Sequence, residues 1–535
     1  MARLGPHRAE AEIALKIRSS RVAQAIGIFL LWWILTALVY HDTQSNFLRS
    51  ESGWYLFLSQ SPPVVQSNFQ KDALTMSFKG HYTPLGFLAE FATAKLVGTR
   101  GWFWKWRQIT AVALLATMFF LFARTGGSAL QLPRAKASFS AFGLTALLIF
   151  QPQMREFVAW PYMILQLGWL LCSTVALLGL VQMALRPTEI VWPWLTAGAA
   201  YTSLHFLGLG IATLAATGIG MAALQQIIRR ATPSDASKLT VPFLTMIALG
   251  ALHAGIMWKF PRPDGLALLP GWQPLPFLAA ALGFIPNFAL ATLRSLFSTS
   301  PVILGSFQTT PDWPYGLAIL LAFWFLLGCA FFQCLREPTA RNRARLILQS
   351  FSSMFFLALI AMIAIRQWRE PTTDGFASYL VGARYLIPST FALAGIRAEF
   401  FFLVATAPIF LNALLNLSLG VCAILGHLQY AAHVYPKTMP LSMISHDLAW
   451  RSVVAMGREC RDANLAIPNV PLGALTQDFY DWDLKLFEPL LRADLKLPPG
   501  TSLQLRSWEG LPDEYYRDVP SLAQVKKRLL LETKN

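Results

Sequence analysis

Residues 1–40 read MARLGPHRAEAEIALKIRSSRVAQAIGIFLLWWILTALVY and decide the class of the fold. Five Lys and Arg residues precede the apolar run 22–40. That run is too long for the core of a cleaved signal peptide and lacks a small-residue cleavage site. The sequence therefore predicts a retained transmembrane helix whose basic N-terminal flank lies on the cytoplasmic side.

The rest of the composition agrees with a membrane protein. The 535 residues are 55% hydrophobic and 13% charged, against about 25% charged residues in soluble proteins, which excludes a water-soluble enzyme. The net charge is +16, from 44 basic and 28 acidic residues. Residues 430–535 hold 13 of each sign, so residues 1–429 hold 44 − 13 = 31 basic and 28 − 13 = 15 acidic residues. Because the basic excess lies between apolar runs, the predicted partner is a lipid bilayer rather than a nucleic acid.

Apolar runs of about 20 residues predict an all-α polytopic membrane protein with about 11 to 13 transmembrane helices. The expected helices are 22–40, 104–124, 138–151, 158–185, 192–206, 208–228, 241–258, 315–335, 347–366, 383–396 and 400–427. Residues 81–97 carry Glu90 and Lys95 and predict a helix at the outer interface. Residues 277–296 are expected to form an embedded surface helix rather than a further crossing.

This topology gives two domains. Residues 1–429 form the membrane domain, with a large first outer loop at 41–103, and place the basic turns on the cytoplasmic side. Residues 430–535 have the composition of a small mixed soluble domain and follow an odd number of crossings, which predicts an extracytoplasmic position. The cysteines show neither a disulfide framework nor a CxxC metal site, so no metal ligands are assigned and a need for a divalent metal stays open.

Ionisable residues concentrate in the first outer loop, at Asp42, Glu51 and His81. Such groups are costly at a membrane edge, which favours a functional role. A plain solvated loop is the alternative. Two later segments have a similar character: Gln151-Pro152-Gln153-Met154-Arg155-Glu156, and Gly382-Ala383-Arg384-Tyr385-Leu386-Ile387-Pro388.

Together these segments resemble the polyprenyl-phosphate-dependent membrane glycosyltransferases of the GT-C class, most closely the protein O-mannosyltransferases and their tetratricopeptide-bearing relatives. An acidic residue after the first helix, then a His-x-x-Pro-Leu element, is similar to 42–85 here. Glu156 keeps the place of a family glutamate, although neither of the neighbouring family histidines is present. Arg384 and Tyr385 match the family's Arg-Tyr-Leu-x-Pro element, whereas the tetratricopeptide tail is absent.

The resemblance implies transfer of a sugar from a polyprenyl-phosphate carrier to a hydroxyl of a protein, lipid or glycan on the extracytoplasmic face of the plasma (inner) membrane. Asp42 and Glu51 are then equal candidates for the general base. The expected substrate-binding residues are His81, Arg155, Glu156, His205, Arg384 and Tyr385. A guanidinium suits phosphate because it is permanently charged and bidentate.

Purely structural roles stay possible for these residues. Glu156 can form an ion pair with Arg155, Arg384 can be an interfacial anchor, and His205 can be a packed hairpin histidine. A transporter or lipid flippase, or a catalytically silent protein of the same fold, are the alternative functions. The lack of repeated halves and of charges at the bilayer midplane favours the transferase.

Overall fold

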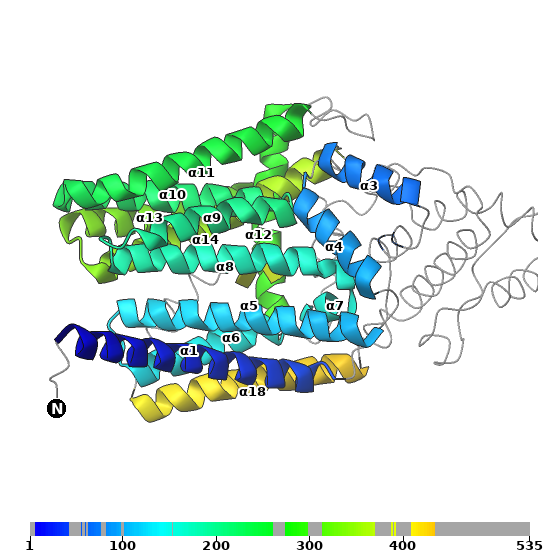
Figure 1. Cartoon of the computed structure of the whole chain (residues 1–535). Helices are drawn as coiled ribbons and strands as arrows, with labels where there is room; N and C mark the ends of the chain where they lie inside the picture. The colour runs from blue at the N-terminus through cyan, green and yellow to red at the C-terminus, as the bar shows by residue number, and fades with distance from the viewer. Residues whose placement is uncertain are drawn as a thin grey trace, which may run out of the picture.

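The computed structural model describes residues 6–41, 55, 59, 63–75, 82–97, 101–151, 153–259, 273–297, 313–369, 387, 388, 390, 391 and 408–433. These residues are helical and contain no strand, which confirms the all-α prediction for this part of the chain (Figure 1). The elements are α1 (Pro6–Val39), α3 (Pro63–Thr75), α4 (Pro84–Val97), α5 (Gly101–Ala129), α6 (Arg134–Ile149), α7 (Met154–Ala159), η1 (Pro161–Met163), α8 (Ile164–Leu185), α9 (Val191–Phe206), α10 (Gly210–Ala231), α11 (Pro233–Lys259), α12 (Pro274–Phe297), α13 (Trp313–Arg336), α14 (Ala340–Arg369) and α18 (Ile409–His433).

Eight helices among the described residues are long and apolar enough to cross a membrane, as a polytopic membrane protein requires. They contain Val22–Val39, Trp102–Ala129, Pro161–Leu185, Gly210–Arg230, Pro233–Met257, Pro314–Arg336, Ala340–Ala364 and Ile409–Leu428. Helices α6 and α9 have 16 residues each, so the larger count of 11 to 13 crossings stays a prediction.

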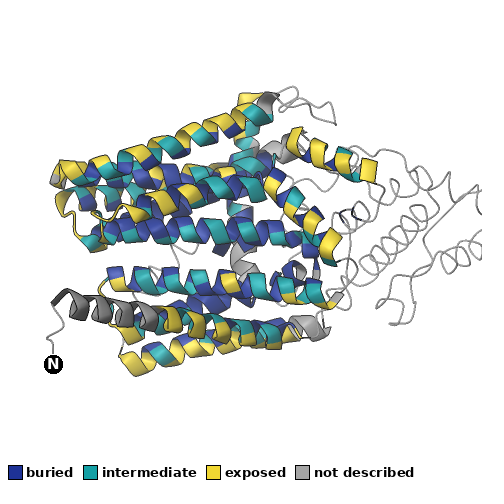
Figure 2. Cartoon of the chain, viewed as in Figure 1, coloured by how far each residue is buried: buried dark blue, intermediate teal, exposed yellow. Residues whose placement is uncertain are grey.

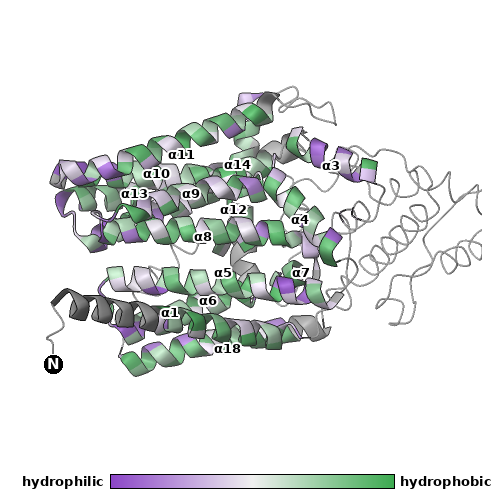
Figure 3. Ribbon diagram, in the orientation of Figure 1, coloured by the Kyte–Doolittle hydropathy of each residue, from purple (hydrophilic) through white to green (hydrophobic). Residues whose placement is uncertain are grey.

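The bundle has a buried centre and an apolar outer surface. Helix α8 is largely apolar and buried, whereas the described side chains of α1 and α18 are mostly exposed or partly exposed (Figure 2). The exposed face is itself apolar, with Phe410 of α18 76% and Phe325 of α13 70% exposed. Hydrophobic residues fill the length of the bundle, and hydrophilic ones gather toward its ends (Figure 3). An exposed apolar belt of this size fits lipid rather than water.

Close helix packing around α8 depends on small and polar side chains. A Cβ on Gly179 would overlap Oγ1 of Thr196 and lie 3.3 Å from its Cβ, so the missing side chain allows the close approach of α9. On another face of α8, the indole Nε1 of Trp169 donates to Oγ1 of Thr213 in α10 at 2.9 Å. These contacts fix α8 between α9 and α10.

The basic turns meet at the end of the bundle where the chain begins (Figure 1). Nε of Arg343 donates to the carbonyl of Ala184 at 2.8 Å, joining the start of α14 to the end of α8. Nζ of Lys238 reaches the carbonyl of Thr188 at 3.4 Å, joining α11 to the turn between α8 and α9. Helices α3, α4 and α7 lie at the opposite end. The turns that contain Thr188, Lys238 and Arg343 thus lie together, and the side of the membrane stays a prediction.

One expected helix is interrupted. Residues 158–185 were predicted to be continuous, but the chain breaks at Trp160, whose φ of −108° and ψ of 104° are extended. The cause is Pro161, because a proline ring disfavours the helical conformation of the residue before it. The break separates the short α7 from α8 and forms the 3-10 turn η1.

The two ambiguous segments are both helical. Residues 84–97 form α4 as expected, at the end of the bundle opposite the basic turns. Helix α12 is less superficial than predicted, because Phe284, Ile285 and Phe288 of its middle are buried in the main core. The predicted domain 430–535 lies outside the described residues, except for the last residues of α18.

Candidate functional site

The predicted site residues differ in what the structure describes. Arg155 of α7 and His205 of α9 are described with their side chains, and Glu156 is placed only as part of α7. Asp42, Glu51, His81, Arg384 and Tyr385 lie outside the described residues. The described segments that flank these residues therefore locate the site.

The first flanking segment is the end of α1. Tyr40, fully buried and two residues before Asp42, donates its phenol hydroxyl to the carbonyl of Ile149 at 2.6 Å. Its ring also lies edge-on to that of His427 in α18, with ring centres 4.7 Å apart. The chain consequently leaves α1 beside the end of α6, from which the second predicted element begins.

The second predicted element, which begins at Gln151, contains α7. This helix has 6 residues, too few to pair all of its backbone N–H and C=O groups internally. Nε2 of Gln108, a buried residue of α5, donates to the carbonyls of Phe157 at 2.7 Å and Trp160 at 3.2 Å. Arg155 in α7 is only 3% exposed, and its charge acts on the phenol of Tyr40. A buried guanidinium thus lies in reach of the end of α1.

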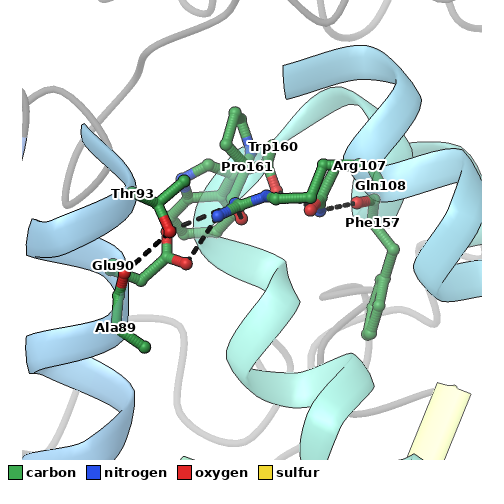
Figure 4. Close-up of polar contacts among 8 residues, drawn as sticks. All are labelled: Ala89, Glu90, Thr93, Arg107, Gln108, Phe157, Trp160 and Pro161. Carbon is green, nitrogen blue, oxygen red and sulfur yellow. Dashed lines mark hydrogen bonds and ion pairs between the residues drawn. The ribbon is translucent and has the colours of Figure 1, made fainter. Parts of the chain in front are cut away.

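A buried ion pair joins three further segments at the same end (Figure 4). Nη1 and Nη2 of Arg107 in α5 contact the two carboxylate oxygens of Glu90 in α4 at 2.6 and 3.2 Å. Nη2 also donates to the carbonyl of Pro161 at 2.8 Å, and the guanidinium lies 4.6 Å from the ring centre of Trp104. Burial raises the pKa of Glu90, and the positive charge of Arg107 opposes that rise. Arg107 was not singled out in the sequence, although an arginine in an apolar helix is a signal of such a role.

The third predicted element lies beside the second. Ile387, Pro388, Thr390 and Phe391 are buried, and they directly follow Arg384 and Tyr385 in the chain. Oγ1 of Thr390 donates to Oε1 of Gln151 at 3.2 Å, across 239 residues of sequence. The chain shortly after Arg384 and Tyr385 therefore contacts Gln151, which lies four residues before Arg155.

His205 ends α9 where α4 crosses it. A Cβ on Gly86 would lie 3.0 Å from the carbonyl of His205, so the absence of a side chain lets the two helices touch. The first outer loop is held here too, because the buried ring of Tyr55 stacks on Tyr162 of η1 at 6.4 Å. Gly86 follows His81 by five residues, so this contact places the helix that follows His81 beside the end of α9.

Two residues near His205 were missed in the sequence. His253 of α11 is 3% exposed and lies with its ring centre 5.1 Å from that of His205, and Tyr201 lies 5.0 Å from His205. Burial, with a smaller effect of Tyr201, raises the pKa of Tyr82 in the same group. A histidine near the end of an apolar helix was the only available signal.

The arrangement offers buried positive charge at Arg155, hydrogen-bonding imidazoles and an aromatic wall at one end of an apolar bundle. No group of three His, Cys, Asp or Glu side chains with the geometry of a metal site occurs among the described residues. Comparisons with protein-family models, with curated proteins and with solved structures found no match.

Proposed function

We propose that the protein is an integral-membrane glycosyltransferase that moves a sugar from a polyprenyl-phosphate carrier to an acceptor hydroxyl on the extracytoplasmic face. One observation carries the proposal: segments flanking all three predicted elements converge at one end of the bundle. Tyr40 bonds to the end of α6, Thr390 bonds to Gln151, and Gly86 contacts the end of α9.

In the proposed reaction the acceptor oxygen attacks the anomeric carbon while the bond from that carbon to the phosphate oxygen breaks. Asp42 or Glu51 takes the proton of the acceptor hydroxyl as general base. The departing polyprenyl phosphate gains negative charge, which Arg384, Arg155 and His205 stabilise.

Burial strengthens the proposed role of Arg155. Its side chain is 3% exposed, and electrostatic attraction is stronger in such a place than in water. In the same proposal, Glu156 and His81 position the sugar or the acceptor, and Tyr385 supports the carrier beside Arg384.

The position of charges in the described spans favours this proposal over a transporter or flippase. Lys, Arg, Asp and Glu in α5, α10, α11 and α14 lie within the first or last two turns of these helices. Transporters commonly place charged residues and broken helices near the bilayer midplane. A site at the edge suits a lipid-linked donor whose head group lies at that depth.

The test uses the purified full-length chain in detergent, a radiolabelled polyprenyl-phosphate mannose and a membrane extract as the source of acceptor. We expect a labelled product with a new glycosidic bond, and its loss in Asp42→Ala or Glu51→Ala. Asp235→Ala is the control, because Asp235 pairs with Lys238 at the opposite end of the bundle. Unchanged turnover in both acidic variants would remove the proposed base.

A second arm separates the alternatives. The same donor is placed on one side of proteoliposomes, and its appearance on the other side is measured. Translocation without a new bond supports a flippase, and neither product nor translocation supports a catalytically silent protein.

A further inference from the structure

The turn between α13 and α14 carries a high density of positive charge. Residues 336–345, REPTARNRAR, contain four arginines and one acid, Glu337. The turn lies at the end of the bundle where the chain begins, and it directly follows the apolar span Pro314–Arg336 (Figure 1). Guanidinium groups at the end of a span lie at the depth of the lipid head groups, so this turn meets the phosphate layer of a bilayer.

One of the four arginines helps to build the turn. Nε of Arg343 donates to the carbonyl of Ala184 at 2.8 Å, which ties the turn to the end of α8. The side-chain amide of Asn342 donates to the carbonyl of Glu337 at 2.9 Å, which ties the start of α14 to the end of α13. These two bonds hold the turn in place and use only one of its four guanidinium groups.

The other three arginines lie where α13 and α14 adjoin. Arg341 and Arg345 are four residues apart at the start of α14 and therefore share one face of that helix. Nη1 of Arg345 donates to Oε1 of Gln333 in α13 at 3.3 Å. Arg336 follows Gln333 by three residues, which is about one turn of α13. Arg336, Arg341 and Arg345 thus form one group, here called the α13–α14 junction, in which Arg336 and Arg341 are exposed.

An apolar stripe on α13 leads directly to this junction. Phe325, Cys329, Phe332 and Arg336 follow one another at intervals of four, three and four residues, so they lie on one face of the helix, and all four are exposed. The side chains of Phe325 and Phe332 are 70% and 66% exposed. Only 11% of the apolar span of α13 is buried, against 72% of that of α14. The stripe therefore faces lipid hydrocarbon and ends at a guanidinium group.

We propose that the α13–α14 junction binds an anionic phospholipid, whose phosphate lies on the three arginines and whose acyl chain lies along the stripe of α13. Arginine is permanently charged and binds phosphate oxygens through two parallel hydrogen bonds. Clusters of basic residues directly beside a membrane helix attract anionic lipids. The continuity of the stripe with Arg336 fits a molecule in which an acyl chain and a phosphate are joined.

Charge favours this occupant over the others. Four arginines and Glu337 give the turn a net charge of 4 − 1 = +3. A zwitterionic phospholipid brings an ammonium group that this charge repels, whereas a soluble phosphate leaves the exposed rings of Phe325 and Phe332 uncovered. A second copy of the chain, packed on the same face about a twofold axis, brings a second positive turn to the contact, and like charges oppose that arrangement.

The test uses the purified full-length chain, delipidated in detergent, and native mass spectrometry. Dioleoyl phosphatidylglycerol and dioleoyl phosphatidylcholine are titrated separately, and the apparent affinity for the first bound lipid is measured. We expect phosphatidylglycerol to bind at least about tenfold more tightly than phosphatidylcholine. The double variant Arg336→Gln with Arg341→Gln should lose at least about tenfold in affinity for phosphatidylglycerol and keep its affinity for phosphatidylcholine.

The matched control is the double variant Arg186→Gln with Lys238→Gln. It removes two positive charges from the same end of the bundle, but each of these side chains pairs with an acid, Glu189 at 3.2 Å and Asp235 at 2.8 Å. We expect this control to bind phosphatidylglycerol as the wild-type chain does. Equal affinity of the wild-type chain for the two lipids, or the same loss in the control as in the arginine variant, overturns the proposal.

Two further measurements address the other occupants. Glycerol phosphate, which has the phosphate without acyl chains, should not displace phosphatidylglycerol when added in large excess, and full displacement would assign the junction to a soluble anion. Phe325→Ala with Phe332→Ala should weaken phosphatidylglycerol binding to the monomer. A wild-type dimer that this variant converts to monomers would instead assign the face to a second copy. The proposal does not rest on sugar transfer, and none of these outcomes bears on it, since no sugar donor is present.

Discussion

Replacement of Arg107 by methionine tests whether the pair with Glu90 stabilises the end of the bundle that contains α3, α4 and α7. Methionine keeps most of the buried stem and removes the charge. The change leaves the carboxyl group of Glu90, 5% exposed, without the partner that contacts both its oxygens. It also removes the donor to the carbonyl of Pro161 and the contact with Trp104.

The expected loss of stability is about 3 kcal/mol at neutral pH. Removing one member of a buried ion pair costs about 3–5 kcal/mol, because the remaining charge is uncompensated. The lost hydrogen bond to the carbonyl of Pro161 adds about 1 kcal/mol. Protonation of Glu90 removes its charge and lowers the first term to about 2 kcal/mol, the cost of an unpaired buried polar group, so the two terms together come to about 3 kcal/mol.

Protonation also gives the loss a pH dependence with a definite sign. Burial already raises the pKa of Glu90, and removal of Arg107 raises it further. An acid whose pKa is higher in the folded state contributes stability below its unfolded pKa of about 4.3 and loses it as the pH rises through the folded pKa. The deficit of Arg107→Met should therefore be smallest at acidic pH, where Glu90 is protonated, and widen as the pH rises through the folded pKa of Glu90.

The assay is the free energy of unfolding in mixed detergent and SDS micelles at several pH values. Arg186→Met is the matched control, because Arg186 and Glu189 form a 3.2 Å pair at the basic end with side chains 51% and 44% exposed. Such an exposed pair contributes less than about 1 kcal/mol. Adding Glu90→Leu to Arg107→Met should recover most of the loss, since no charge is then buried. Equal deficits for the Arg107 and Arg186 variants at every pH would refute the reasoning.

Three further changes test how the segments are joined. Tyr40→Phe should lower the free energy of unfolding by about 1–2 kcal/mol, because it leaves the carbonyl that ends α6 without its donor at 2.6 Å; no loss would deny that bond. Gly86→Ala should speed hydrogen exchange in α4, since the new Cβ meets α9, while Gly198→Ala has no atom within 4 Å and should not; equal rates contradict the packing. Thr390→Val should cost about 1 kcal/mol by removing the bond to Gln151, and unfolding equilibria that match wild type would separate these segments.

Hydropathy predicts most of the bundle because each membrane helix satisfies its own backbone and needs only an apolar surface. The expected helix at 104–124 lies within α5, and that at 208–228 nearly matches α10. Hydropathy does not predict the structure where an apolar run is compatible with more than one arrangement. Residues 158–185 are apolar throughout, yet a single proline at 161 divides them, and α12 is apolar enough for a surface or for a core.

The candidate site was harder to predict from the sequence, because its contacts join residues that are far apart in the chain. Tyr40 and Ile149 are 109 positions apart, and Thr390 and Gln151 are 239 apart. The family resemblance selected Arg155 and His205, which the structure describes at this end of the bundle. It did not select Arg107 or His253, since each is a single polar residue whose partner lies on another helix.

The distribution of buried polar groups explains why this end can act as a site. Among the described residues, the basic turns at the other end are mainly exposed, as with Arg186 and Glu189. At the end that contains α4 and α7, Glu90, Arg155 and His253 are each at most 4% exposed. Burying such groups costs free energy unless partners compensate. Hydrophobicity alone therefore does not explain why they lie together at this end. Tyr40, Arg107 and Gln108 join the helix ends by hydrogen bonds and so hold these groups in fixed positions, which the proposed sugar transfer requires of its site.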